Sequence, residues 1–173
     1  LLFVGRIHAI KSLDLLLQSL IEVKGNIKLT ILGVLEDQDY WQQCQLFINR
    51  LPSTIVVEYR GDVAPHHLQK IYQEHHVFVL PTKGENFGHA IFDAFAHGLP
   101  ALISDQTPWR NLETIKAGWD LPLNEVQAFT DKMNEVVAWT DETYQEWKKG
   151  AHQFALKFVQ DSNLIHSYQK LFQ

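Results

Sequence analysis

The chain has 173 residues, with 15 Lys and Arg against 20 Asp and Glu, and its formal net charge is −5. This length suits a single domain with a sizeable core. The negative charge disfavours a nucleic-acid partner, because phosphate binding needs clustered cations. The sequence contains no apolar run of membrane-spanning length, and its only cysteine, Cys44, rules out an internal disulfide and fits a reducing, cytoplasmic compartment.

Strands and helices are expected to alternate along most of the chain. Apolar runs that end at glycine or a turn predict five strands, over residues 1–5, 27–33, 54–61, 76–82 and 100–105. Apolar residues at helical spacing predict four intervening helices, over residues 11–23, 37–51, 65–75 and 86–98. After Asp105 the strand signal fades, and three further helices are expected over 125–140, 141–158 and 162–172.

The expected strands are continuous apolar runs, which is typical of strands buried on both faces of a parallel sheet. Such βα units in series predict an α/β fold: a Rossmann-like, doubly wound parallel sheet in an α/β/α sandwich, with extra C-terminal helices over 150–173. Ligands of these sheets bind beyond the carboxyl ends of the strands. A site is therefore expected among the loops 5–11, 33–36, 59–65, 81–88 and 105–110.

The end of the first strand combines a glycine with two cations. Gly5 permits close backbone approach, Arg6 offers a planar fork suited to phosphate, and Lys11 adds a point charge. Together the two cations could neutralise a diphosphate, although exposed cations near a turn are also common without any ligand. The G-x-G-x-x-G and G-x-x-x-x-G-K-[ST] patterns are absent, so ordinary dinucleotide and P-loop sites are not expected.

Residues 81–100, PTKGENFGHAIFDAFAHGLP, place two acids eight positions apart. A helix that starts near Asn86 or Phe87 would offer free N–H groups to an anion, and Gly88 would let a ligand approach the backbone. Glu85 would lie at the mouth of this helix, where a solvated acid favoured by the helix dipole is the simpler alternative.

The second acid of this stretch, Asp93, would lie roughly 10–12 Å further along the helix. Its neighbours are apolar, so the sequence predicts a desolvated carboxylate that needs a partner. Carboxylates are natural acceptors for sugar hydroxyls, and a ribose diol offers two donors to one acid.

The segment GENFGHAIFD (84–93) resembles the E-x7-E motif of retaining GT-B glycosyltransferases of family 4. FVGRIHAIKSLDLLLQSL (3–20) and AFAHGLPALISD (94–105) resemble their C-terminal, donor-binding domain, in order and spacing up to about residue 120. The resemblance implies that residues 1–173 are a single nucleotide-sugar binding domain, and that the N-terminal acceptor domain lies outside this sequence. A first residue in mid-strand agrees with a piece of a longer protein.

The resemblance also implies roles for individual residues. The expected catalytic residues are Arg6 and Lys11, which would bind the donor diphosphate, and Glu85, which would face the sugar hydroxyls. Asp93 would hold the ribose, backbone N–H groups at the helix mouth would contact sugar and phosphate, and the 59–63 loop would border the nucleobase. The expected substrate-binding residues are Gly5, Arg60, Gly61, Val63, Asn86, Phe87, Gly88 and Asp93.

Three departures from the family pattern stand in the same segments. Asp93 replaces the usual second glutamate and is one methylene shorter, which could weaken ribose binding. Ser12 follows Lys11 where the family usually has glycine, and it restricts the local backbone. QTPWRNL (106–112) replaces a glycine-rich turn with a glutamate, as in bacterial members that make surface polysaccharides.

The resemblance implies transfer of a sugar from a nucleoside diphosphate with retained anomeric configuration, in polysaccharide or lipopolysaccharide synthesis. No metal or other cofactor is expected, and the isolated chain is expected to bind its donor but to transfer nothing. The expected partners are the donor and the N-terminal acceptor domain, which could bring the full-length enzyme to the inner face of a membrane. Two alternatives stay open: a non-catalytic nucleotide- or sugar-binding module, and a flavodoxin-like interaction domain. The nucleobase, the sugar and the acceptor are not predicted.

Overall fold

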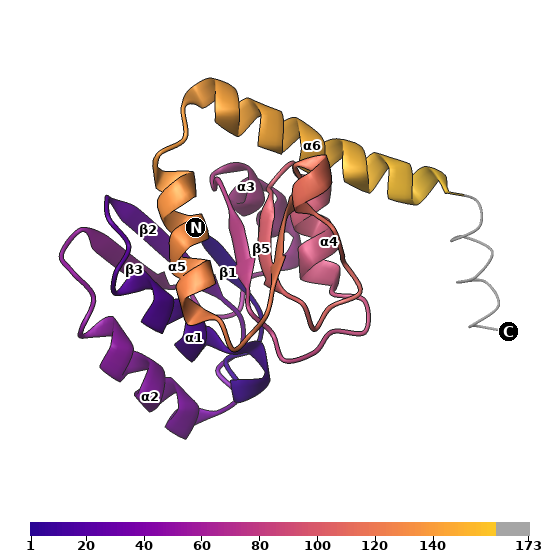
Figure 1. Cartoon of the computed structure of the whole chain (residues 1–173). Helices are drawn as coiled ribbons and strands as arrows, with labels where there is room; N and C mark the ends of the chain where they lie inside the picture. The colour runs from indigo at the N-terminus through magenta and orange to yellow at the C-terminus, as the bar shows by residue number, and fades with distance from the viewer. Residues whose placement is uncertain (162–173) are drawn as a thin grey trace, which may run out of the picture.

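A computed structural model describes residues 1–161 of the chain, which form one parallel sheet with helices packed around it (Figure 1). The strands lie in the order β3-β2-β1-β4-β5-β6. Their bounds are Leu2–Val4 (β1), Ile27–Leu32 (β2), Ile55–Tyr59 (β3), Phe78–Leu80 (β4), Ala101–Ser104 (β5) and Gly118–Leu121 (β6). This is the order of dinucleotide-binding folds and not the 2-1-3-4-5 order of flavodoxin-like domains, so the flavodoxin-like alternative is wrong.

Within residues 1–161, six α-helices and two short 3-10 helices connect or follow the strands. Their bounds are Ala9–Lys11 (η1), Leu13–Leu20 (α1), Gln38–Ile48 (α2), Pro65–Gln73 (α3), His89–Ala96 (α4), Glu113–Ile115 (η2), Val126–Val137 (α5) and Asp141–Gln160 (α6). Helix α1 packs against α2 and α5, while α4 packs against α6. The predicted α/β/α architecture is confirmed. The helix expected over 162–172, and apolar surface expected near 164–172, lie outside the described residues.

Strand β6 is absent from the sequence prediction, which ended the sheet at the fifth strand. Gly118 starts β6 in a left-handed conformation (φ +146°), and a Cβ there would clash with the Ala101 carbonyl oxygen of the neighbouring strand. The strand is only four residues long and pairs on one side, so it lacks the continuous apolar run by which the inner strands are recognised.

The C-terminal helices are anchored to the sheet by aromatic side chains. Trp147 of α6 stacks on Trp119 of β6 with ring centroids 4.3 Å apart, and Trp139 lies 5.3 Å from Trp147. Helix α6 starts near the amino ends of the strands, where the Tyr144 hydroxyl donates to the His75 carbonyl, and runs across that end of the molecule in Figure 1.

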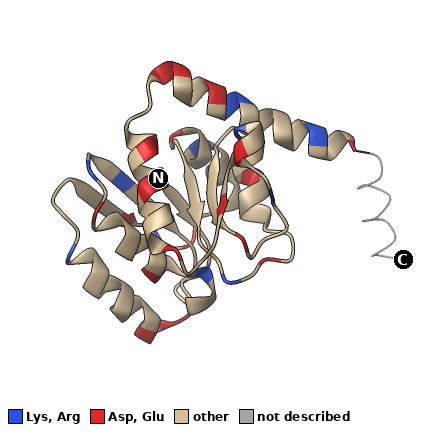
Figure 2. Cartoon of the chain, in the orientation of Figure 1, with Lys and Arg blue, Asp and Glu red and all other residues tan. Residues whose placement is uncertain are grey.

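Acidic and basic positions are scattered along the chain, as Figure 2 shows, and Lys and Arg do not gather on one face in that view. Within residues 1–161, no helix has both the length and the apolar character needed to cross a membrane. Cys44 is a free, fully buried thiol, and burial raises its pKa to about 12. This thiol is therefore protonated and unsuited to act as a nucleophile.

Candidate functional site

The loops after β1 and β4 lie side by side, because these two strands are neighbours in the sheet although they are far apart in the sequence. Leu2 is in register with Phe78. At the carboxyl ends, the Ile10 carbonyl accepts two hydrogen bonds from the β4 loop, from the Lys83 N–H at 2.7 Å and from Thr82 Oγ1 at 3.1 Å. The chain reverses its winding at this point of the sheet, which is where such folds bind their ligands.

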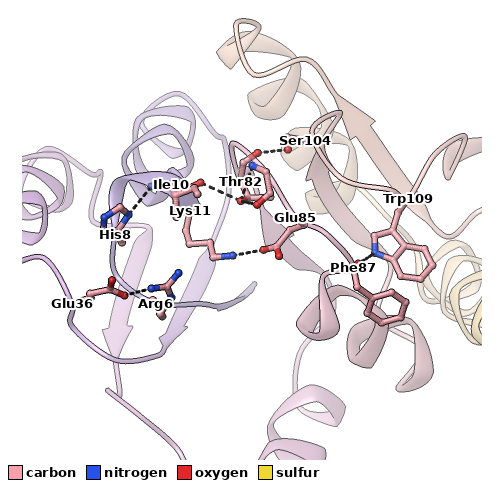
Figure 3. Close-up of polar contacts among 11 residues, drawn as sticks. Arg6, His8, Ile10, Lys11, Glu36, Thr82, Glu85, Phe87, Ser104 and Trp109 are labelled. Atoms are coloured by element: carbon pink, nitrogen blue, oxygen red, sulfur yellow. Dashed lines mark hydrogen bonds and ion pairs between the residues drawn. The ribbon is translucent and has the colours of Figure 1, made fainter. Parts of the chain in front are cut away.

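Lys11 and Glu85 meet across these two loops in an ion pair (Figure 3). Their side chains are 14% and 16% exposed, so both charges are largely removed from water. Lys11 ends the short helix η1, whose first turn is capped by His8 Nδ1, which accepts from the Ile10 N–H at 3.1 Å. The structure therefore brings together two of the three residues that the sequence predicted to be catalytic.

Arg6, the third of them, lies one residue beyond the Gly5 that follows β1 and forms an ion pair with Glu36. Arg6 Nη1 is 2.6 Å from Glu36 Oε2, and the two side chains are 58% and 40% exposed. Figure 3 places this pair beside the Lys11–Glu85 pair at the same edge of the sheet. The sequence prediction included the 33–36 loop but assigned no role to Glu36, because nothing in its local pattern distinguishes it from a solvated acid.

Gly33 links the expected positions Gly5 and Gly61, and the sequence prediction missed its role. A Cβ on Gly33 (φ +138°) would clash with the Gly5 carbonyl oxygen, so this close approach requires glycine. The Gly33 N–H donates to the Gly61 carbonyl at 2.8 Å, and its own carbonyl accepts from the Tyr59 hydroxyl at 2.9 Å. Gly33 directly follows the buried strand β2, and this position in the sequence could have indicated a close backbone approach.

Arg60 is exposed and turned along the edge strand. Its Nη2 lies 2.9 Å from Glu58 Oε2, and Lys28 contacts the same carboxylate. Hydrogen bonds from Arg60 and then Lys28 lower the pKa of Glu58 to about 2. Val63 is half-buried against the core. Within residues 1–161, neither side chain forms a hydrogen bond or an ion pair with Lys11 or Glu85, so the predicted contribution of these two residues depends on the backbone of the 59–63 loop.

Helix α4 begins later than the sequence predicted. Its first residue is His89, and Gly88 is the N-cap, in the left-handed region (φ 78°, ψ 63°) and without a side-chain cap. Asn86 is exposed and does not cap the helix. The reason is tertiary, since the Phe87 carbonyl accepts a 2.7 Å hydrogen bond from Trp109 Nε1 and the turn is fixed before the helix starts (Figure 3).

Asp93 lies on the exposed side of α4, whereas Ile91, Ala94 and Phe95 are buried. The sequence predicted a desolvated carboxylate that needs a partner, and the structure shows only partial desolvation, because the apolar neighbours in sequence point to the opposite face. Partial desolvation still raises the pKa of Asp93, while His97 and His89, one turn away on either side, lower it.

The end of β5 and the loop that follows it form three hydrogen bonds with the loop after β4. The Ser104 hydroxyl donates to the Thr82 carbonyl, the Glu85 N–H donates to the Gln106 carbonyl at 3.2 Å, and Trp109 donates to the Phe87 carbonyl. The sequence prediction included this loop in the expected site but assigned no role to its side chains. A tryptophan within a short polar loop was a signal, since a buried indole N–H needs an acceptor.

Ser12 has a left-handed backbone conformation, which glycine adopts at less cost than serine. It is 2% exposed, lies in the left-handed region (φ 50°, ψ 44°), and its buried hydroxyl has no hydrogen-bond partner among the described residues. The sequence predicted that Ser12 restricts the local backbone. The structure shows that the backbone keeps the left-handed conformation at Ser12, so the restriction appears as strain. Within residues 1–161, no group of three His, Cys, Asp or Glu side chains is placed to hold a metal ion.

Comparison with known proteins gives one family and several relatives. Residues 1–138 match the family model described as "Glycosyl transferases group 1". The chain is 27% identical over 151 residues to the capsular polysaccharide biosynthesis glycosyltransferase CapM of Staphylococcus aureus, covering 83% of this chain and 37% of CapM. The chain thus spans well under half the length of the curated relative that it matches.

Two solved structures illustrate the shared fold. Anabaena Alr3699/HepE in complex with UDP is similar with a TM-score of 0.81 and 18% identity, over 98% of this chain and 48% of that one. The catalytic domain of the Helicobacter pylori cholesterol-α-glucosyltransferase is similar with a TM-score of 0.69 and 17% identity, over 90% of this chain and 97% of that one.

Proposed function

The chain belongs to the glycosyl transferases group 1 family, and from this membership we propose that it is the donor-binding part of a retaining, family 4 GT-B enzyme. The observation that supports this most directly is the largely buried ion pair of Lys11 and Glu85 at the switch point of the sheet, next to Arg6. A purely structural pair has no need to lie where α/β sheets bind their ligands.

In this proposal Arg6 and Lys11 bind the diphosphate of the donor. When the bond between the anomeric carbon and the distal phosphate oxygen breaks, negative charge grows on the leaving diphosphate. Fixed cations in a partly desolvated site stabilise that charge, which in other transferases is the task of a metal ion. The acceptor oxygen forms the new bond to the anomeric carbon, and the acceptor proton leaves with the diphosphate or to water.

Glu85 and Asp93 then contact the two sugars of the donor. Glu85 accepts hydrogen bonds from hydroxyls of the transferred sugar, and Lys11 is shared between Glu85 and the phosphate, since an ammonium group offers three donors. The exposed Asp93 carboxylate is free to receive a ribose diol, because none of the ion pairs among the described residues involves it. The backbone of the 59–63 loop, with Gly61 fixed by Gly33, borders the nucleobase.

The donor that we propose is a uridine diphosphate sugar. The HepE structures contain UDP or UDP-glucose, and the pneumococcal O-GlcNAc transferase GtfA was solved with UDP and GlcNAc. The similarity to CapM supports a role in polysaccharide synthesis. We propose the cytoplasm, at the inner face of a membrane, as the place of this reaction. An N-terminal domain would bind the acceptor. We therefore expect the 173-residue chain to bind the donor without transferring sugar.

Binding of UDP, GDP and ADP to the 173-residue chain, followed by calorimetry, tests the proposal. We expect UDP to bind the wild type and to lose at least tenfold in affinity in Lys11→Ala. Lys83→Ala is the matched control, since Lys83 is an exposed lysine of the adjacent loop without an ion pair among the described residues. Sugar transfer by the full-length protein separates an enzyme from a non-catalytic binding module, and the absence of any nucleotide binding would refute both.

A further inference from the structure

Trp109 is a buried tryptophan in the loop after β5, and it is only 4% exposed. Its ring packs among five phenylalanine rings of the helix mouth, α4 and α6, with centroids 5.0–5.9 Å away: Phe87, Phe92, Phe95, Phe154 and Phe158. Aromatic packing of this kind fixes the plane of the indole, and hence the direction in which its N–H points.

That N–H donates to the Phe87 carbonyl at 2.7 Å. The Phe87–Gly88 peptide is trans, like the other peptide bonds of residues 1–161, so its carbonyl and the Gly88 N–H point in opposite directions. The Gly88 N–H therefore points away from the indole and its aromatic surroundings. Figure 3 shows Trp109 on one side of the 85–87 segment and the Lys11–Glu85 pair on the other.

This peptide would be easy to rotate without an external constraint. Gly88 adopts φ 78° and ψ 63°, and glycine visits both signs of φ at similar cost, so it does not itself select one orientation. The N-cap position offers no side-chain hydrogen bond to fix it either. Trp109 supplies such a constraint through its hydrogen bond to the Phe87 carbonyl.

We propose that Trp109 is a positioning residue for the transfer reaction: its indole N–H fixes the Phe87–Gly88 peptide so that the Gly88 N–H faces the donor diphosphate. The proposal rests on the proposed function, since it needs a donor at the switch point. The proposal assigns a role to Trp109 within the QTPWRNL segment (106–112), which departs from the family pattern. Trp109 itself touches no reacting atom, because it lies behind the peptide that it orients.

The test compares Trp109→Phe, which removes the N–H, with Phe154→Leu, which loosens the same aromatic cluster without touching the hydrogen bond. Both substitutions are expected to lower thermal stability. Only Trp109→Phe is expected to weaken UDP binding, by at least fivefold in calorimetry. In ¹⁵N NMR spectra, the Gly88 amide signal should shift on UDP addition in wild type and in Phe154→Leu, but much less in Trp109→Phe.

Equal loss of UDP affinity in the two variants would overturn the inference, because packing alone would then explain it. Wild-type affinity in Trp109→Phe would overturn it as well, and so would UDP binding to wild type without a shift of the Gly88 amide. If Trp109→Phe fails to fold, 3-benzothienylalanine at position 109 keeps the ring shape and lacks the N–H, and the same comparison applies. A wild-type chain that binds neither UDP, GDP nor ADP would instead refute the proposed function and this inference with it.

Discussion

Lys11 and Glu85 stand 74 positions apart in the sequence, yet they form an ion pair that is largely shielded from water between the β1 and β4 loops. Removing one partner leaves an unpaired, partly desolvated charge. We expect Lys11→Met and Glu85→Gln each to lower the free energy of unfolding by about 1–2 kcal/mol. The double variant should lose less than the sum, and additive losses in urea unfolding would contradict the coupling.

Arg6 should affect binding and not stability. Its pair with Glu36 is more than half exposed on the arginine side, and such pairs contribute at most about 1 kcal/mol. Arg6→Ala is therefore expected to unfold within about 0.5 kcal/mol of wild type while UDP affinity falls about tenfold. Lys70→Ala, which breaks the exposed Lys70–Glu74 pair of α3, is the control and should change neither quantity.

Substitutions of Asp93, which is one methylene shorter than the family glutamate, test whether this residue binds the ribose. If Asp93 receives the ribose hydroxyls, Asp93→Ala should weaken UDP binding several-fold, and Asp93→Glu should keep or improve it because the longer side chain matches the family residue. Binding of 2′-deoxy-UDP should depend less on residue 93 than binding of UDP does. Equal affinities for the two nucleotides in all three proteins would remove Asp93 from the site.

Ser12 is expected to be a site of local strain. A non-glycine residue in the left-handed region costs roughly 1 kcal/mol, and its buried hydroxyl lacks a partner among the described residues. Ser12→Gly should raise the free energy of unfolding by about 1 kcal/mol, since it relieves both costs. Ser12→Ala removes only the hydroxyl and should gain less, and an equal gain in thermal unfolding would show that the backbone is not strained.

His75 should make stability fall below neutral pH. Burial lowers its pKa, and its Nδ1–H donates to the Ile71 carbonyl at 2.6 Å while Nε2 accepts from Thr30 Oγ1 at 2.8 Å. The unfolded state then binds the proton more readily, so this contribution is complete above the unfolded pKa of about 6.5 and is lost as pH falls toward the folded pKa.

The measurement is the free energy of unfolding between pH 7 and pH 5 for wild type and His75→Gln. The wild type should lose more stability over this range, by several tenths to about 1 kcal/mol. His66→Gln, on the exposed surface of α3, provides the control for a histidine in contact with water. A wild-type profile parallel to that of His75→Gln would show that His75 does not titrate differently on folding.

The expected core strands and helices are confirmed where local pattern and burial agree. The inner strands β1, β2, β4 and β5 are mostly apolar and buried because helices cover both faces of the sheet, and the sequence shows this directly. The edge strand β6 was missed, since a short strand with one neighbour needs no apolar run. The start of α4 was placed too early because the Trp109 bond to Phe87 is invisible in local sequence.

The sequence by itself determined the alternation of strands and helices, the edge of the sheet that bears the site, and the two cations and two acids around it, because short-range periodicity and turn chemistry specify these. Only the tertiary structure decided which of these groups meet. It pairs Lys11 with Glu85 and Arg6 with Glu36, and it turns Asp93 outward. The physical reason is the strand order, which places β1 beside β4. These neighbouring strands are separated in the sequence by whole βα units, and a local sequence pattern does not encode which distant residues will meet.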